Sequence, residues 1–136
     1  MSKKALDTVK KKFKSEVLEE HNQHGDETVV VKDKKLVKIC EFCRDDKNLR
    51  FDMLTDLTVV DYLMQGNEAR FELVLHLFST EKKHRLRIKV PISGDEPKVA
   101  SVVDVWKSAT WMEREAWDMY GVVFDGHPDL RRILLY

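Results

Sequence analysis

Residues 70–90 read Arg-Phe-Glu-Leu-Val-Leu-His-Leu-Phe-Ser-Thr-Glu-Lys-Lys-His-Arg-Leu-Arg-Ile-Lys-Val. Every second residue is apolar from position 71 to 77, and again from 86 to 90, where basic residues fill the alternate positions. Because successive side chains of a strand point to opposite faces, this alternation predicts two strands, each with one buried and one wet face. The polar stretch between them predicts an antiparallel hairpin. These residues therefore indicate a sheet that is covered on one side.

The residues before position 51 predict a helix, a strand and a second helix. Residues 3–20 place apolar side chains four apart among lysines, which is the pattern of a helix that buries one stripe. Residues 27–32 are rich in valine and predict a short strand. Asp33 is expected to cap the second helix. The apolar residues of that helix, at the spacing i, i+3, i+4, i+7, are Leu36, Ile39, Cys40 and Cys43.

Residues 51–62 predict a third strand, joined to the hairpin by a loop at 64–68. After the hairpin, proline and glycine residues turn the chain into a region that we expect to be helical. The apolar stripe predicted for that region consists of Val99, Val102, Val103 and Trp106. A last helix is predicted to begin at Thr110, which has capping-box spacing to Glu113, and to end at Gly121.

The predicted order of elements is helix, strand, helix, three strands, helices and tail. Helices packed on one face of a mainly antiparallel sheet make an α+β domain, a two-layer sandwich. A chain of 136 residues is long enough for one domain that buries its own core. We expect a single domain over residues 1–125, followed by a C-terminal docking tail over residues 126–136.

The charges of the chain balance, with 24 basic and 24 acidic residues. Balanced charge gives no overall field that attracts nucleic acid or an anionic membrane, so we expect neither as a partner. No apolar run approaches the ~20 residues that a membrane-spanning helix requires, so direct membrane insertion is not expected. The two cysteines do not suggest the framework of a disulfide-rich secreted protein. These features are typical of a soluble cytoplasmic domain.

The pair of cysteines in Cys40-Glu41-Phe42-Cys43 is the first candidate for chemistry. A C-x-x-C pair can bind zinc, ligate an iron–sulfur cluster or exchange disulfides. Metal sites normally require four ligands and no second pair accompanies this one, while His21 and His24 have ligand-like spacing in a polar loop. Because both cysteines fall on the apolar stripe of a predicted helix, we interpret them as packed core thiols. A self-contained redox enzyme built on this pair is the alternative.

The most distinctive stretch, residues 113–134, reads Glu-Arg-Glu-Ala-Trp-Asp-Met-Tyr-Gly-Val-Val-Phe-Asp-Gly-His-Pro-Asp-Leu-Arg-Arg-Ile-Leu. Its charged helical turn could be a general acid–base cluster, yet no nucleophile, phosphate-binding loop or metal triad lies near it in sequence. We favour a structural or interface role, with Arg114 and Asp118 paired at i, i+4 and Glu113 as the helix cap. His127 either caps the helix end or reaches a neighbour. Core or interface anchoring is the role expected of the tryptophans, Trp106, Trp111 and Trp117.

This stretch resembles the signature of the 30 kDa subunit (the C subunit) of respiratory complex I, the NADH:quinone oxidoreductase. The signature positions are filled by Glu113, Arg114, Glu115, Asp118, Met119, Tyr120, His127, Arg131, Ile133 and Leu134. The resemblance extends over the region from Phe51 onward, whereas the residues before it fit the family only in pattern. It implies no catalytic, cofactor-binding or metal-binding residue in this chain. The residues implied as family signature and interface are Glu113, Arg114, Glu115, Asp118, His127, Arg131 and Arg132.

The resemblance further implies a non-catalytic structural subunit of the hydrophilic arm of a proton-pumping enzyme, where it supports electron transfer from NADH to quinone. The expected chief partner is the quinone-site subunit of complex I (its D subunit), with neighbouring iron–sulfur subunits. NAD, FMN, iron–sulfur clusters and quinone would belong to the whole complex, with none bound by this chain, and the isolated chain would show no activity. The expected location is peripheral, on the cytoplasmic side of the bacterial inner membrane. The alternative is the equivalent subunit of a membrane-bound nickel–iron hydrogenase or another complex-I-like dehydrogenase.

The tail after Gly126 holds a His-Pro turn, two arginines and an aliphatic end. Arg131 and Arg132 can make forked hydrogen bonds to carboxylates, and exposed aliphatic residues fit a partner better than water. We therefore expect residues 126–136 to dock on a partner, with a last edge strand of the same domain as the alternative. Members of the family usually continue beyond the Arg-Arg-Ile-Leu segment, so the interface is expected to be incomplete in a chain that stops at Tyr136.

Overall fold

A five-stranded sheet forms one layer of the structure, a computed structural model that describes residues 4–21, 27–62 and 70–128. Within these residues the strand order is β1-β2-β5-β4-β3, and every pairing is antiparallel except the parallel one between β2 and β5. The predicted mainly antiparallel sheet is therefore confirmed. The strands are β1 (Val17–His21), β2 (Thr28–Val31), β3 (Met53–Asp61), β4 (Phe71–Ser79) and β5 (His84–Ile92).

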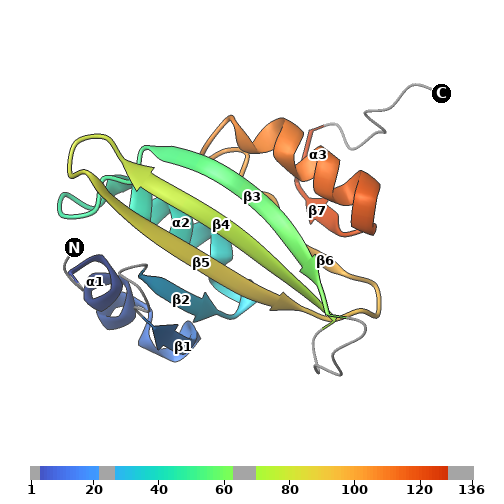
Figure 1. Cartoon of the computed structure of the whole chain (residues 1–136), viewed down its shortest axis with the longest axis horizontal. Coiled ribbons are helices and arrows are strands. Elements are labelled where there is room, and N and C mark those ends of the chain that lie inside the picture. Colours follow the sequence, from blue (N-terminus) through green and yellow to red (C-terminus); the bar gives the residue numbers. More distant parts are fainter. Residues whose placement is uncertain (1–3, 22–26, 63–69, 129–136) are drawn as a thin grey trace.

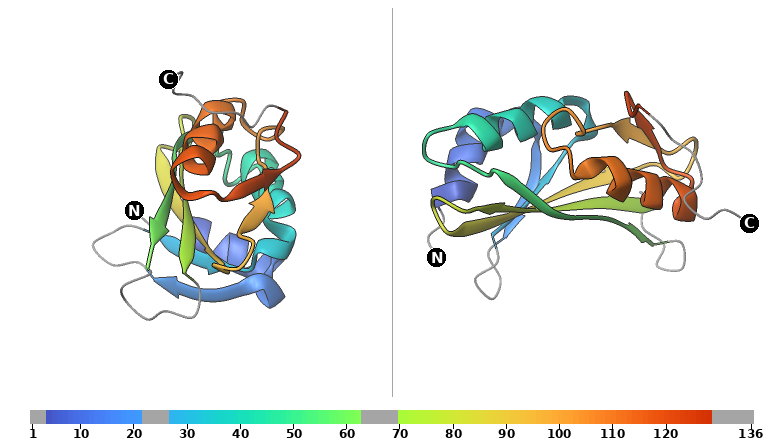
Figure 2. Two further views of the ribbon diagram at one scale, coloured as in Figure 1. Left: turned by 90° about the vertical axis from the view of Figure 1, so that its right-hand side faces the viewer. Right: turned by 90° about the horizontal axis from the view of Figure 1, so that it is seen from above.

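Helices form the second layer, on one face of this sheet (Figures 1 and 2). They are α1 (Lys4–Lys12), α2 (Leu36–Asp45) and α3 (Ala109–Tyr120), with short 3-10 turns at Lys14–Glu16 and Asp33–Lys35. A small parallel sheet of β6 (Lys98–Ala100) and β7 (Val123–Asp125) lies beside α3. Over the described ranges, no helix covers the opposite face of the large sheet. The predicted two-layer α+β fold is confirmed.

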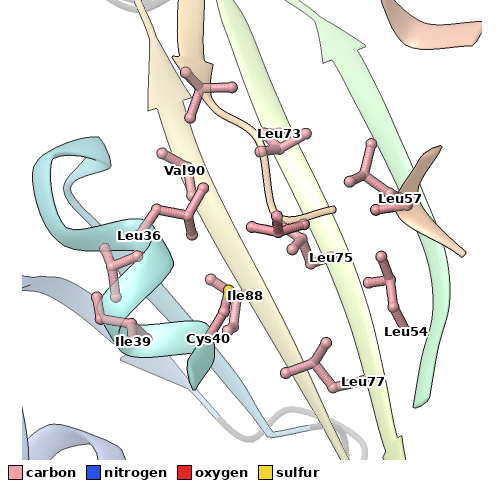
Figure 3. Close-up of a cluster of buried hydrophobic side chains, with 14 of the residues drawn as sticks. Leu36, Ile39, Cys40, Leu54, Leu57, Leu73, Leu75, Leu77, Ile88 and Val90 are labelled. Atoms are coloured by element: carbon pink, nitrogen blue, oxygen red, sulfur yellow. The ribbon is translucent and has the colours of Figure 1, made fainter. Parts of the chain in front are cut away.

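The core lies between the helices and the covered face of the sheet (Figure 3). The predicted alternation of apolar residues over 71–77 and 86–90 is confirmed. The inward side chains of β4 and β5 are almost fully buried: Leu73, Leu75, Leu77, Leu86, Ile88 and Val90. The opposing stripe of α2 has no exposed surface and consists, as predicted, of Leu36, Ile39, Cys40 and Cys43. Burying one large aliphatic side chain stabilises a fold by roughly 1.5–3 kcal/mol, so these two facing rows are a major source of stability.

The helix predicted over residues 3–20 is wrong beyond Lys12. The chain makes a 3-10 turn and then forms β1, which pairs antiparallel with β2 at the edge of the sheet. This pairing satisfies backbone groups along β2, and such a tertiary contact overrides a local helical pattern. Phe13 still packs inward, because its ring centroid lies 5.6 Å from that of Phe42 on α2.

The helical stripe predicted between Val99 and Trp106 is also wrong. Residues 98–100 form β6, and turns follow until α3 begins. The partner of β6 is β7, more than twenty residues later in the chain, and Ser101 N donates a further 2.8 Å bond to Asp125 O. Val99 therefore belongs to a strand although its spacing to Val102 and Val103 suits a helix, because a distant segment completes the hydrogen bonds of β6. Burial was predicted better than conformation, since Val99, Val102 and Trp106 are buried and Val103 is half-buried.

Two predicted helix caps are wrong, whereas the predicted helix stop is confirmed. Asp33 lies exposed in a 3-10 turn, and no side-chain cap bond is made at the start of that turn or of α2. Helix α3 begins at Ala109, and the Thr110 hydroxyl donates 2.8 Å to Lys107 O instead of forming a capping box. Gly121 ends α3 in the left-handed region, at φ 74°. The loop at 64–68, His24 and the His21 side chain lie outside the described residues.

Candidate interaction surface

Helix α3 directs the first signature residue into the protein. Glu113 has no exposed surface, and its two carboxylate oxygens accept hydrogen bonds from the Ser101 hydroxyl (2.5 Å) and from Val102 N (2.9 Å). The Ser101 oxygen in turn accepts a 3.1 Å bond from Val103 N. The helix is thereby fastened to the segment that follows β6. Glu113 is thus an internal anchor and not the predicted helix cap.

The environment of Glu113 disfavours its charged form. Burial raises the pKa of this carboxyl above its ordinary value, while the bonds from Ser101 and Val102 and the nearby His127 partly oppose that rise in pKa. Both carboxylate oxygens of Glu113 accept a hydrogen bond, and these bonds stabilise the local fold. The desolvation of the carboxylate opposes this stabilisation.

His127 joins the segment after β7 to the first turn of α3. Its Nε2 lies 2.6 Å from Thr110 O, and because a carbonyl can only accept, this ring nitrogen carries the hydrogen. Gly126, at φ 90°, permits the turn that brings the ring into place. The prediction that His127 caps the helix end or reaches a neighbour thus resolves to a contact at the start of α3.

The remaining signature residues of α3 lie nearer to solvent. Glu115 is exposed, while Arg114 and Asp118 are half-buried. The Nε of Arg114 is buried without a hydrogen-bond partner, so this atom does not make the predicted bond to Asp118. The other two predicted interface residues, Arg131 and Arg132, lie outside the described residues.

A groove of about 390 Å³ separates α3 from β3, the edge strand of the large sheet. Its lining residues are Thr55, Asp56, Leu57, Thr58, Val59, Trp111, Met112, Glu115, Ala116, Met119 and Tyr120. Two large apolar side chains of α3 are notably accessible here, with Trp111 56% and Met119 64% exposed. Exposed apolar surface beside a groove is typical of an interaction site. Sequence reasoning marked the helix but missed the groove, because β3 is more than fifty residues away.

The tryptophans divide between core and surface, as their two expected roles allow. Trp106 is buried, and its Nε1 donates 3.0 Å to Phe51 O just before β3. Trp117 is half-buried and packs against the core, whereas Trp111 borders the groove. Trp106 is therefore a core anchor, and Trp111 is the accessible aromatic residue of α3.

A second hollow, of about 490 Å³, lies at the sheet face that carries Arg85 and Arg87. Acidic and basic side chains are mixed in its lining, which consists of Glu27, Thr55, Asp56, His76, Leu77, Phe78, Arg85, Leu86 and Arg87. Opposite charges brought together in this way do not make a one-signed field for nucleic acid or an acidic ligand.

The interpretation of the C-x-x-C pair as packed thiols is confirmed. Cys40 and Cys43 are free and fully buried on α2. Burial raises the pKa of both thiols well above the ordinary value, and neighbouring acidic groups add to the rise in pKa. Across the described part of the chain, no three His, Cys, Asp or Glu side chains are grouped so that they could hold a metal ion. The same residues contain no helix that is long and apolar enough to cross a membrane.

Comparison with known proteins places the signature in a family. Residues 29–136 match the family described as respiratory-chain NADH dehydrogenase, 30 Kd subunit. A C subunit of NADH-quinone oxidoreductase from Geotalea uraniireducens is 42% identical over 132 residues, which are 97% of this chain and 78% of that protein. The subunit of the same name from Burkholderia mallei is 51% identical over 115 residues, 81% of this chain. The match spans 58% of the length of that second relative.

Two solved structures share the fold. The trypsin-resistant fragment of Nqo5 has a TM-score of 0.78 and 27% identity, over 94% of this chain and 98% of the fragment. A chain of the membrane-bound sulfane sulfur reductase, an archaeal respiratory membrane complex, has a TM-score of 0.80 over 98% of this chain and 75% of its own length. With 20% identity, that second likeness shows the fold alone.

Proposed function

Because the chain belongs to the family of the 30 kDa subunit of respiratory-chain NADH dehydrogenase, we propose that it is a non-catalytic structural subunit of the hydrophilic arm of an NADH:quinone oxidoreductase. In that arm it supports electron transfer from NADH to quinone by packing against the quinone-site subunit. The observation that supports this role is the accessible apolar surface of α3, where Trp111 and Met119 stand beside the charged signature residues. Residues 126–136 are proposed as a docking segment of the same interface.

The redox groups are proposed to belong to neighbouring subunits. NAD, FMN, iron–sulfur clusters and quinone act in the whole complex, and this chain binds none of them. Supporting this division, the described residues offer no grouped metal ligands, and both thiols are buried with a raised pKa. A cluster ordinarily requires four thiolate ligands, and the sequence has two cysteines. The isolated chain is therefore expected to show no visible absorbance and no NADH oxidation.

The proposed location is peripheral, on the cytoplasmic side of the bacterial inner membrane. No spanning helix is present in the described ranges, so attachment to the membrane is proposed to occur through the other subunits. Neutral overall charge argues against a separate electrostatic attachment to anionic lipid. The isolated chain should accordingly fail to sediment with anionic vesicles, and strong sedimentation would contradict this mode of attachment.

Assembly of the complex tests the proposed interface. Trp111→Glu combined with Met119→Glu places two charges on the accessible surface of α3, and the amount of the chain in purified complex should fall about tenfold or more. The matched control is Leu18→Glu, a charge at a residue 50% exposed on β1, at the opposite edge of the sheet. The control should assemble normally, and both variants should melt like the unmodified chain. Normal assembly of the α3 variant would refute this interface.

The alternative function places the same fold in a different enzyme complex. The alternative is the equivalent subunit of a membrane-bound nickel–iron hydrogenase or another complex-I-like dehydrogenase, since the same fold occurs in a chain of the sulfane sulfur reductase. Copurification separates the two functions, because NADH-binding subunits should accompany the chain in the first case. Recovery with a hydrogenase large subunit would favour the second.

A further inference from the structure

His127 holds the chain beside one end of the groove between β3 and α3. Its Nε2 lies 2.6 Å from Thr110 O, in the first turn of α3. That turn lies at the start of β3, because the Ser108 hydroxyl donates 3.2 Å to Leu54 O. At the other end of the groove, the ring of Tyr120 meets that of Phe71, which pairs with the last residue of β3. Helix α3 and strand β3 thus run side by side away from the turn that His127 contacts (Figure 1).

The groove combines an apolar floor with an acidic rim. Buried or half-buried side chains from both walls supply the floor: Leu57, Val59, Met112 and Ala116. Asp56 on β3 and Glu115 on α3 are exposed lining residues, one on each wall. In the described residues β3 pairs only with β4, so no strand pairs with its other edge. A segment that suits this groove has aliphatic side chains and positive charge.

The next eight residues of the chain have that chemistry. Residues 129–136 read Asp-Leu-Arg-Arg-Ile-Leu-Leu-Tyr, with two adjacent arginines and four aliphatic side chains. We propose that, in the free chain, the groove between β3 and α3 is the docking site for residues 129–136 of the same chain. The inference concerns the free chain and does not depend on the proposed function.

The lengths of the two segments agree. From Thr110 to Met119 the helix rises about 14 Å. Six extended residues beyond Pro128 span at most about 20 Å, so Leu134 can reach Met119. At about 3.4 Å per residue, Arg131 and Arg132 can lie about 10–14 Å beyond Pro128, where their long side chains reach back to Glu115, about 8 Å along the helix from Thr110. The aliphatic residues that follow have length to spare to reach Met119. One register therefore matches charge with charge and apolar with apolar surface.

Burial of exposed side chains supplies the driving force. Trp111 and Met119 present large apolar surfaces, and covering such a surface stabilises a contact in proportion to the area removed from water. Because the tail is already tethered at His127, its local concentration at the groove is high. Its docking therefore costs less entropy than the binding of a separate molecule. A second copy or a partner subunit would have to displace a tethered segment.

An engineered disulfide tests the proposal in the whole 136-residue chain. Met119→Cys and Leu134→Cys are combined, and the protein is oxidised mildly with oxidised glutathione, which accepts the two electrons. The native thiols are buried with a raised pKa and should not compete. We expect an intramolecular disulfide, seen as a monomer on a non-reducing gel with two hydrogens lost by mass. The matched control, Leu18→Cys with Leu134→Cys, places the first thiol at the opposite edge of the sheet.

The cross-linking rates decide between the possible occupants. The pair at positions 119 and 134 should close about tenfold faster than the control pair, because docking raises its effective concentration. A disulfide-linked dimer in place of the monomer would assign the groove to a second copy and overturn the proposal. Equal rates for the two pairs would also overturn it, leaving the groove to another protein.

A charge exchange provides an independent readout. Glu115→Lys should slow closure of the 119–134 disulfide by repelling the arginines. Adding Arg131→Glu and Arg132→Glu to that variant should restore the rate. Failure of the exchange to change the rate in either direction would contradict the proposed register. None of these measurements involves other subunits, so their outcome is separable from that of the assembly test.

Discussion

The Ser101 hydroxyl donates a 2.5 Å hydrogen bond to the buried carboxylate of Glu113. The second carboxylate oxygen accepts a bond from the backbone of Val102, so one side chain of α3 holds the segment that leaves β6. Because β6 also pairs with β7, the contact links three elements that are separated in sequence. The outer face of α3 keeps its position through this internal anchor, and the signature residue acts on the surface indirectly.

Removing the anchor should weaken the whole domain. Glu113→Ala deletes both acceptors and leaves the Ser101 hydroxyl and Val102 N without them, which should lower the free energy of unfolding by about 3 kcal/mol. Urea titration followed by circular dichroism measures this change. Glu115→Ala, on the exposed side of the same helix, is the control and should change the free energy by less than about 0.5 kcal/mol. Equal small effects of both substitutions would show that the buried bonds contribute little.

The stability of the domain should carry a pH dependence that belongs to Glu113. Its pKa in the folded protein is raised above the ordinary value of 4.5, so the folded state binds the proton more tightly than the unfolded state. The contribution is therefore fully present below pH 4.5 and is lost as pH rises through the folded pKa. Relative to Glu113→Gln, which cannot titrate, the unmodified protein should lose stability over that window. Other carboxyl groups contribute equally to the pH dependence of both proteins, so their effect cancels in the comparison. One of them is Asp52, whose pKa is lowered by hydrogen bonds from Thr80.

Local periodicity predicted the elements that bury one continuous stripe. The rows of β4, β5 and α2 were correctly placed because each has a strong period, and all face a common core. The errors share one cause, since β1 and β6 are short strands whose hydrogen-bond partners lie elsewhere in the chain. A helical spacing of apolar residues does not reveal whether another strand, near in sequence for β1 and distant for β6, will satisfy the backbone.

The candidate surface was only partly visible in the sequence for a related reason. Charged residues of a helix are usually solvated, and this expectation misplaced Glu113. The spacing of Glu113 does indicate its burial. The buried stripe of α3 has the positions i, i+4, i+7 and consists of Ala109, Glu113 and Ala116. The groove could not be predicted from α3 alone, because its other wall is β3 and its shape depends on how the two elements pack.

The stop of α3 should depend on the backbone freedom of Gly121. At φ 74°, an added Cβ would meet no atom within 4 Å, so the cost of a substitution comes from the backbone itself. Gly121→Ala should lower the free energy of unfolding by roughly 1–2 kcal/mol, the cost of a left-handed residue that has a Cβ. Gly121→Asn should cost less, because asparagine tolerates this conformation better. Thermal and urea unfolding of the pair measure the difference, and equal losses would contradict a backbone origin.

The two thiols of α2 should be inert in the folded protein, which separates a structural subunit from a thiol redox enzyme. Both are fully buried and their pKa values are raised, so few molecules present a reactive thiolate. Labelling by a maleimide in native buffer should be roughly 100-fold slower than in urea, because access requires opening of a core that is stable by several kcal/mol. Cys43→Ser should cost about 1–3 kcal/mol by burying a hydroxyl among apolar side chains. Labelling as fast in native buffer as in urea would instead show an accessible pair and revive the redox interpretation.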